Sequence, residues 1–500
     1  MAKKHLIGQT RRQFIQTSFV AAVGLTLAPN LLQASNVSLP ETPAKRRFGK
    51  IDFMVTTLGL GGQASIQWTP VGIDPVAIIL KAYGLGVNYY DTSNYYGPSQ
   101  MNYGKAFRQL GLVPGQQNYD DKKRKAIFVT SKTGLRFAKG GDDRKDVYGG
   151  TNGPAGSKTL DDVRRTLTQV FGDGTGNYPE TAYLDMVLIH TLSKMGEVDA
   201  LYEGYDHPDP KAESIGALAA LRDVRDGTNR TGLNPKNEKL IRHIGFSGHK
   251  DAAVMIEMIQ RDTENLIDGM LVAINANDKN FFNMQYNVIP VAAAKNIGII
   301  AMKVFADGAM YTKKAEWSNT PAHVVLQVSS PELPANQLIR YSLTTPGIHT
   351  AIIGIGQISD DPKQCQLTQN LIGAQVKPTD LSQEDRIAIE ALASKSKGGK
   401  TNYFQNPYQD LTAPREAKVL VEKGGKAHIA WHTAYAGDAA IDHYEIWRDG
   451  IKVKNISFAP QTTKIPHLFT DNFGKTIPKQ YVVKVVDKKE RVAETIPLLA

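Results

Sequence analysis

The feature that most constrains the fold is an alternation of short apolar runs with amphipathic stretches, beginning near Arg46. The apolar runs have the length of buried strands, and the stretches between them have helical periodicity. Counting a first short strand after a hairpin at 46–62, the sequence contains about eight strand–helix units. This repeat predicts an α/β protein with a (β/α)₈ TIM barrel over residues 46–395, with a doubly wound sheet as the alternative. The later strands are expected at 87–91, 127–132, 184–190, 241–247, 269–275, 298–305 and 349–354, and the helices at 75–84, 101–110, 160–171, 215–227, 252–261, 288–296, 336–345 and 381–395.

Two helix starts carry clear capping signals. Asp74 is followed by proline at the first helical position, and Ser382 precedes the last amphipathic stretch. Long loops interrupt the pattern at 136–157 and 203–214, after the third and fourth strands. In a barrel these loops lie at the C-terminal mouth, where they shape access to a site. The alternative is that they are surface insertions without a function, because such insertions have the same sequence pattern.

The pattern changes after a linker at 396–411. Residues 412–500 read as alternating strands joined by short turns, which predicts a small all-β sandwich domain. Trp431, the hairpin "YEIWRDG" and the late strand "YVVKVVD" resemble a fibronectin type III-like domain. No chemistry is visible in this segment, so we expect a spacer or a docking surface for an envelope partner.

The N-terminus resembles an export signal. Adjacent Arg11 and Arg12 with Phe14 precede a modest apolar stretch, and cleavage after Ala34 is expected. The pair of arginines is typical of the twin-arginine signal, with a generic export signal or an unstructured tail as alternatives. The twin-arginine route carries folded proteins and predicts a periplasmic location. The single Cys365 agrees with this prediction, because a chain with one cysteine has no internal disulfide to form.

Composition narrows the function classes. The chain is 41% hydrophobic and 22% charged, and it has no long uninterrupted apolar stretch, so we expect no transmembrane span. The net charge is +10, and four of the positive charges lie before the first acidic residue, Glu41. The remaining excess is spread without a basic run, which argues against a nucleic acid partner.

Three successive predicted strands end in an ionisable residue, namely Asp91, Lys132 and His190. In a barrel these C-terminal strand ends share one rim, where catalytic groups lie. Tyr96 follows Asp91 in the next loop, within "YYDTSNYYG". A single ionisable residue at a strand end is more often structural than catalytic. Three such residues on successive strands, followed by a tyrosine, are hard to attribute to chance.

These four side chains suit proton transfer to or from a carbonyl or alcohol. A lysine ammonium near a phenol is expected to lower the tyrosine pKa, and Asp91 would keep that lysine charged. A neutral histidine can orient a carbonyl oxygen. None of these groups can supply a hydride, so a cofactor is required.

The motifs "GVNYYDTSNYYG", "VTSK", "LDMVLIH" and "IRHIGFSGH" resemble the aldo-keto reductase superfamily in order and spacing, over residues 46–392. The resemblance implies a nicotinamide cofactor and a small carbonyl or alcohol substrate. It also implies that Tyr96 is the proton donor and that Asp91, Lys132 and His190 support it. Tyr95 has the wrong spacing and is expected to pack or to line the substrate site.

Several positions depart from the family pattern. Where the family has Ser-Asn to bind the carboxamide, this chain has Ser247 followed by Gly248 and His249. Asn275 is expected near the nicotinamide, Met302 in place of an aromatic stacking residue, and Lys303 near phosphate.

Gly354 matches the family's turn on the adenosine side, and Asn370 is also expected to bind the cofactor. The usual basic residue for a 2′-phosphate is not evident, and Lys363 is the only candidate before Asn370. NADP is the family expectation, with NAD as the alternative. No metal-site spacing or G-x-S-x-G motif is found in the sequence. An NAD(P)-dependent oxidoreductase is favoured over a non-catalytic cofactor-binding scaffold of the cell envelope.

Overall fold

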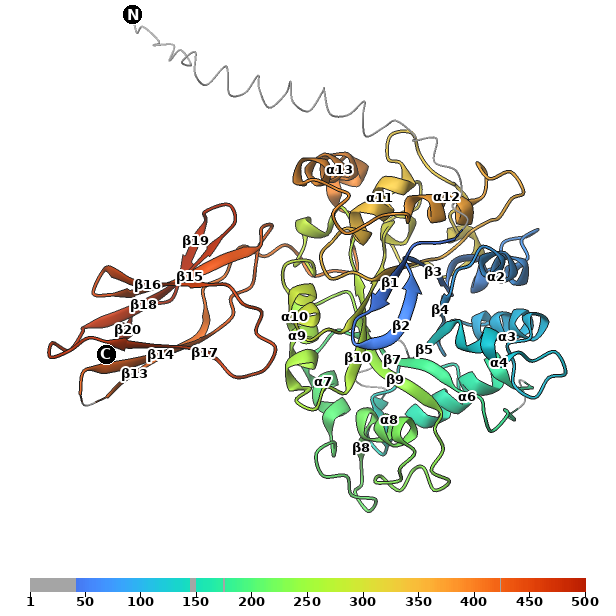
Figure 1. Cartoon of the computed structure of the whole chain (residues 1–500), viewed down its shortest axis with the longest axis horizontal. Helices are drawn as coiled ribbons and strands as arrows, with labels where there is room; N and C mark the ends of the chain where they lie inside the picture. The colour runs from blue at the N-terminus through green and yellow to red at the C-terminus, as the bar shows by residue number, and fades with distance from the viewer. Residues whose placement is uncertain (1–41, 144–149, 174–175, 423) are drawn as a thin grey trace, which may run out of the picture.

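A computed structural model describes residues 42–143, 150–173, 176–422 and 424–500 (Figure 1). The predicted signal peptide at 1–34 lies outside the described residues. Among the helices that are described, none is both long and apolar enough to cross a membrane.

Eight parallel strands close into a barrel. Neighbouring strands follow one another along the chain, and the last strand, β12, pairs with the first, β3. This closure confirms the predicted (β/α)₈ barrel and excludes the doubly wound sheet. The barrel strands are β3 (Leu58–Gly61), β4 (Tyr89–Asp91), β5 (Phe128–Thr133), β7 (Leu184–Leu192), β9 (Ile241–Gly248), β10 (Ile267–Ala273), β11 (Gly298–Met302) and β12 (Thr350–Ile353).

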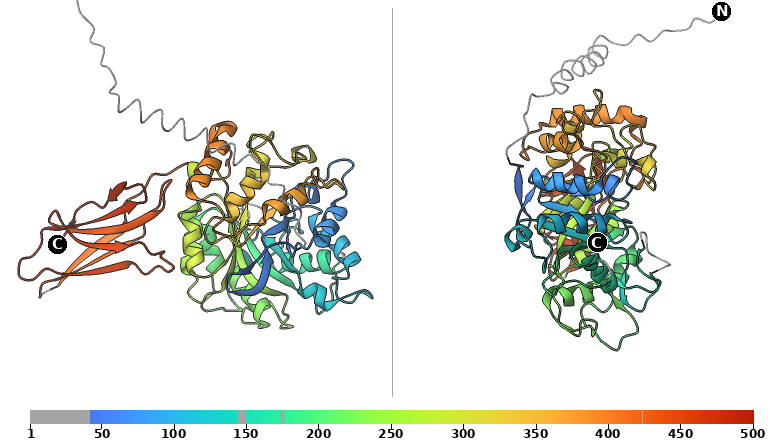
Figure 2. Two further views of the ribbon diagram at one scale, coloured as in Figure 1. Left: turned by 45° about the horizontal axis from the view of Figure 1, so that its top comes forward. Right: turned by 90° about the vertical axis from the view of Figure 1, so that its right-hand side faces the viewer.

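Helices surround this barrel (Figure 2). Both predictions of helix capping residues are confirmed. The Asp74 carboxylate accepts from the Val76 amide at 2.8 Å, and the Ser382 hydroxyl accepts from the Asp385 amide at 3.1 Å. The helices are α2 (Pro75–Gly84), α3 (Ser99–Leu110), α4 (Asp121–Lys125), α6 (Thr159–Phe171), α7 (Met195–Tyr202), α8 (Ala217–Asp226), α9 (Ala252–Arg261), α10 (Val288–Ala294), α11 (Ala335–Leu343), α12 (Gln366–Gly373) and α13 (Gln383–Lys395), with 3₁₀ turns η1 (Ala64–Ile66), η2 (Asp278–Asn280), η3 (Ala306–Gly308), η4 (Pro321–His323) and η5 (Ser396–Gly399).

An N-terminal hairpin closes one end of the barrel. Strands β1 (Lys45–Phe48) and β2 (Ile51–Thr56) pair antiparallel, and Phe48 packs edge-on against Tyr89 and Phe128. The ring leaves no space for a side chain at Gly298, whose Cβ would lie 2.7 Å from Phe48. Tyr89, Phe128 and Gly298 are each the first residue of a strand, so the hairpin packs against the N-terminal end of the barrel.

The C-terminal segment forms two antiparallel sheets around a core of its own. Trp431 is buried there and contacts Tyr444, with ring centroids 5.6 Å apart. One sheet contains β13 (Arg415–Glu422), β14 (Lys426–His432) and β17 (His467–Asn472). The other contains β15 (Ile441–Arg448), β16 (Ile451–Ser457), β18 (Gln480–Asp487), β19 (Val492–Glu494) and β20 (Leu498–Leu499).

These sheets lie against the flank of the barrel, beside α9 and α10 (Figures 1 and 2). The side-chain amide of Asn283 donates to the Gly437 carbonyl at 2.8 Å. The Asn287 side chain both donates to the Ala436 carbonyl and accepts from its amide. Because these partners are buried and specific, the C-terminal module has a defined position on the barrel.

Several pieces of secondary structure were not predicted, among them helices α4, α7 and α12 and two short strands. Within the predicted loop at 136–157, β6 (Phe137–Lys139) pairs with β8 (Ile215–Gly216), which takes the first two residues of the helix predicted at 215–227. Helix α12 follows β12 after a long turn. The strands β6 and β8 are too short to show an alternating pattern of apolar residues. The start of α12 has no clear sequence signal, because a long turn precedes it.

Candidate active site

Asp91, Lys132 and His190 lie on three adjacent strands at one end of the barrel. Asp91 is the last residue of β4, which pairs with β5 and places Asp91 opposite Thr130. Lys132 in β5 is in turn opposite Leu188 in β7, two residues before His190. The sequence order of the strands thus brings the three side chains together, as predicted.

Asp91 and Lys132 form a buried ion pair. The Lys132 Nζ lies 2.6 Å from Asp91 Oδ2 and donates to the Thr92 carbonyl at 2.8 Å. Burial raises the pKa of Asp91 and lowers the pKa of Lys132, while the attraction between the two charges opposes both shifts. The other carboxylate oxygen, Oδ1, is buried with no hydrogen-bond partner among the described residues.

Tyr96 lies directly over this pair. Lys132 Nζ is 4.6 Å from the centre of the Tyr96 ring, and the His190 ring meets it edge-on at 5.5 Å. Tyr95, in contrast, is 47% exposed, against 8% for Tyr96. The structure therefore places Tyr96, and not its neighbour, beside the lysine and the histidine.

The predicted lowering of the Tyr96 pKa is wrong for this structure. Burial, followed by the negative charges of Asp91 and Asp307, raises the pKa of Tyr96 well above its ordinary value. Lys132 does not reverse this effect, because its charge is paired with Asp91. Tyr96 is held protonated, which is the form that can donate a proton.

His190 is held in the neutral form that the sequence predicted. Burial, with the positive charge of Lys132 next in size, lowers the pKa of His190 well below its ordinary value. The Ser93 hydroxyl lies 3.2 Å from His190 Nδ1. On the backbone side, buried Arg136 donates to the His190 carbonyl at 2.8 Å. These contacts fix the ring at the edge of Tyr96.

A cavity of about 1060 Å³, which includes the open solvent at its mouth, extends from Asp91 and Tyr96 to Asn370. Of the predicted cofactor residues, Met302, Lys303, Gly354 and Asn370 line it. Its wall includes the apolar side chains of Leu271, Met302 and Ile352 as well as Tyr96. Such a long, partly apolar cavity suits a planar ring at one end and a nucleotide along its length.

Two glycines that line the cavity are packed tightly against neighbouring parts of the chain. A Cβ on Gly62 would lie 2.4 Å from the Asp91 carbonyl oxygen, and a Cβ on Gly354 would lie 2.9 Å from Ala64. Because both glycines line the cavity and carry no side chain, a phosphate-bearing ligand can approach the backbone closely at these positions. The residues present thus fit a nicotinamide dinucleotide.

Ser247 and Asn275 are not part of the cavity wall. Ser247 Oγ accepts from the Thr191 amide at 2.9 Å, which ties β9 to β7. Asn275 lies two residues beyond the end of β10, and its amide donates to the Lys303 carbonyl and to Asn402. The polar atoms of both side chains form hydrogen bonds with other residues of the protein, and neither residue lines the cavity.

A strap that the sequence did not predict forms part of the cavity wall. It comprises residues 324–328, and all but one of them line the cavity. Gln366 at the start of α12 holds it, donating to the carbonyls of Val325 and Gln327 at 2.9 and 2.8 Å. A Cβ on Gly356 would lie 2.3 Å from the Val325 carbonyl oxygen, so the strap fits only against glycine. Gly356 and Gln366 are the only sequence signals for it.

A family model for the aldo/keto reductase family matches residues 57–351, which is more than half of the chain. The chain belongs to the aldo/keto reductase family. Membership implies a nicotinamide-dependent oxidoreductase of small carbonyl or alcohol substrates. The matched residues contain all eight strands of the barrel apart from the last two residues of β12.

Individual aldo/keto reductase relatives are distant. L-galactose dehydrogenase of Arabidopsis thaliana is 22% identical over 365 residues, which cover 69% of this chain and 93% of that protein. An aldo/keto reductase of Klebsiella pneumoniae, solved with NADP and acetate, is 15% identical with a TM-score of 0.41, covering 70% of this chain and 96% of that one. The fibronectin-III array of RIM-binding protein is 19% identical with a TM-score of 0.15, covering 19% of this chain and 37% of that one.

Proposed function

We propose that this protein is an exported, NADP-dependent oxidoreductase that interconverts a carbonyl and an alcohol, with Tyr96 as the proton donor. The observation that carries the proposal is the position of Tyr96, which lines the cavity and contacts both Lys132 and His190. NADP is the cofactor named for the Klebsiella pneumoniae protein. NAD is the alternative, because Lys303, the only cation among the described residues that line the cavity, is paired with Asp307.

Each side chain of the site has a distinct role in this proposal. When bound, the cofactor supplies or accepts the hydride. Tyr96 gives its proton to the carbonyl oxygen of the substrate, and neutral His190 orients that oxygen from the ring edge. Lys132 stabilises the negative charge that remains on the phenol after it has given up its proton. Asp91 keeps Lys132 charged and fixed beneath the ring.

The raised pKa of Tyr96 predicts opposite pH dependences for the two reaction directions. Reduction requires the protonated phenol, which persists when the pKa lies above its reference value of about 10. We therefore expect kcat/KM for reduction to be constant from about pH 6 to pH 9, whereas oxidation requires the phenolate and should rise about tenfold per pH unit. Steady-state rates in both directions test this, and a reduction rate that falls through a pKa of about 7 would contradict it.

We further propose that the cofactor is loaded before export and then retained. The support is the twin-arginine motif at Arg11 and Arg12, together with the strap at 324–328 in the cavity wall. With an association rate of about 10⁶ M⁻¹s⁻¹, a Kd of about 1 pM gives release at about 10⁻⁶ s⁻¹, which is days. Such an enzyme would regenerate its cofactor in place by oxidising one substrate and reducing another.

The test is to purify the protein after export, dialyse it extensively, denature it and assay the released nucleotide. We expect about one nucleotide per chain, and bleaching of the reduced nicotinamide absorbance when the loaded protein meets a suitable carbonyl compound. The panel should include aldoses, because the Arabidopsis thaliana relative is named for a sugar. An apo-protein that binds added NADPH only at micromolar strength would contradict retention. Failure to bind either nucleotide at all would contradict the function.

A further inference from the structure

Asp307 connects the cavity to the linker between the two parts of the chain. It lies in the cavity wall, within the segment 303–318 that follows β11 and is called here the cavity loop. The Tyr403 hydroxyl, from the linker at 396–411, donates to Asp307 Oδ2 at 2.9 Å. Ser318 donates to the same oxygen through its amide and its hydroxyl, and Lys303 and Lys313 each lie 3.4 Å from the carboxylate.

The Asp307 carboxylate is a charged acceptor. Burial alone would raise its pKa, but Lys303 and Lys313, with the hydrogen bonds from Tyr403 and Ser318, lower it below its ordinary value. Hydrogen bonds to an ionised acceptor are stronger than those between neutral groups. The contact with Tyr403 is therefore among the stronger links between the linker and the barrel.

The cavity loop needs such links, because its backbone is strained. Lys303, Ala306 and Asp307 have φ values of 59°, 50° and 58°, in the left-handed region that side chains other than glycine rarely adopt. A conformation of this kind persists only where the surroundings impose it. Without its contacts to residues outside 303–318, the cavity loop would adopt a less strained backbone conformation.

The linker touches this loop at further points. Asn402 pairs with Asn275, whose amide also holds the Lys303 carbonyl. At the start of the linker, Ser396 Oγ donates to the Met310 carbonyl at 3.0 Å and Lys397 Nζ to the Tyr311 carbonyl at 2.9 Å. The linker therefore runs along the cavity loop instead of passing through solvent.

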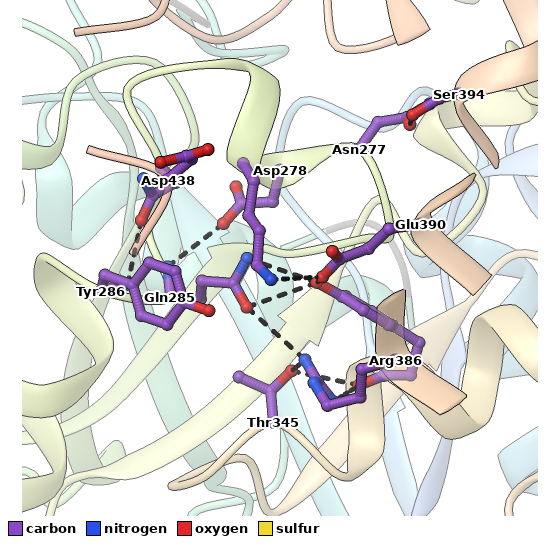
Figure 3. A network of polar contacts seen from close by, with 12 residues as sticks. Asn277, Asp278, Gln285, Tyr286, Thr345, Arg386, Glu390, Ser394 and Asp438 are labelled. Carbon is purple, nitrogen blue, oxygen red and sulfur yellow. Dashed lines mark hydrogen bonds and ion pairs between the residues drawn. The ribbon is translucent and has the colours of Figure 1, made fainter. Parts of the chain in front are cut away.

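The other side of the linker is anchored to the barrel and leads to the docked C-terminal module. The Gln405 side chain donates to Asp278 at 2.7 Å, and the backbone amide of Asn406 donates to the Lys250 carbonyl at 2.9 Å. Asp278 belongs to the polar network in Figure 3, in which Arg386 and Glu390 of α13 also lie. This network fixes the helix from which the linker starts.

We propose that the linker holds the cavity loop in place and that Tyr403 is a positioning residue for Asp307, so that the attachment of the C-terminal module sets how slowly nucleotide leaves the cavity. The effect on nucleotide release rests on the function proposed above, whereas the effect on the loop does not. Tyr403 does not line the cavity, and its hydroxyl reaches the cavity wall through Asp307. Its ring also meets Trp317 and lies near Lys313 of the cavity loop, and these ring contacts are kept in Tyr403→Phe.

The test compares full-length Tyr403→Phe with Tyr408→Phe, the same change at a more exposed tyrosine of the linker. The first readout is the rate at which bound nucleotide is released into excess competing nucleotide. The second is trypsin cleavage after Lys313 and Lys314 in the cavity loop of nucleotide-free protein. We expect Tyr403→Phe to raise both rates about tenfold, equivalent to about 1.4 kcal/mol, and Tyr408→Phe to leave them unchanged. In an Asp307→Asn background the effect of Tyr403→Phe should largely disappear.

Equal rates for Tyr403→Phe and wild type in both assays would overturn the proposal. If the wild-type protein binds no nucleotide, the function proposed above fails, and trypsin alone decides: faster cleavage in Tyr403→Phe supports the role of the linker, and unchanged cleavage overturns it. A melting temperature close to wild type confirms that each variant is folded before the rates are compared.

Discussion

Tyr96→Phe should slow hydride transfer by about 10²–10⁴-fold, the usual contribution of general acid–base catalysis. The change removes only the hydroxyl, so the ring still packs between Lys132 and His190. Nucleotide affinity should therefore stay within about twofold of wild type. Single-turnover oxidation of bound reduced nucleotide by a carbonyl substrate measures the chemical step apart from product release.

Tyr95→Phe is the matched control for this prediction. It makes the same change one residue earlier, on a side chain that is about half exposed. We expect it to keep nearly the full rate. If Tyr95→Phe is the more damaging variant, or Tyr96→Phe keeps more than about a tenth of the rate, Tyr96 is not the proton donor.

Lys132→Met should be the most destabilising single change in the site. It leaves the Asp91 carboxylate buried without its partner at 2.6 Å, and breaking a buried ion pair from one side costs about 3–5 kcal/mol. The expected result is a barrel unfolding transition at lower denaturant, together with loss of activity. Chemical denaturation monitored by barrel and module probes separately would measure the change in unfolding free energy.

The double variant Asp91→Asn with Lys132→Met separates stability from catalysis. Removing both charges removes the unpaired carboxylate, so most of the lost stability should return. Activity should not return, because no positive charge remains beside Tyr96. A double variant as unstable as Lys132→Met alone would show that the packing of the lysine, and not its charge, matters for stability.

The sequence predicts the barrel, and the meeting of Asp91, Lys132 and His190 at one rim, because both depend on local pattern. Short apolar runs separated by amphipathic stretches predict parallel strands, and the C-terminal ends of parallel strands meet at one rim. Asp91, Lys132 and His190 each end such a run, so their proximity followed from topology alone. Tyr96 followed from its short loop after β4.

The rest depends on contacts between distant segments. Asn275 was expected at the nicotinamide, but its partner is Asn402, which is 127 residues away. The strap at 324–328 is held by Gln366, about 40 residues later, and no local pattern indicates that pairing. The Tyr96 pKa was predicted in the wrong direction, because the sequence shows which charges are present but not how deeply the phenol is buried.

The most direct test of the account is the transfer of a hydrogen label. The exported protein is loaded with NADPH carrying deuterium on the transferable position of the nicotinamide ring, and a carbonyl substrate from the panel is added for a single turnover. The account predicts that the alcohol product carries deuterium on the former carbonyl carbon, and that Tyr96→Phe forms this product at least about a hundred times more slowly. An alcohol without deuterium, or label transfer that is unchanged in Tyr96→Phe, would contradict it.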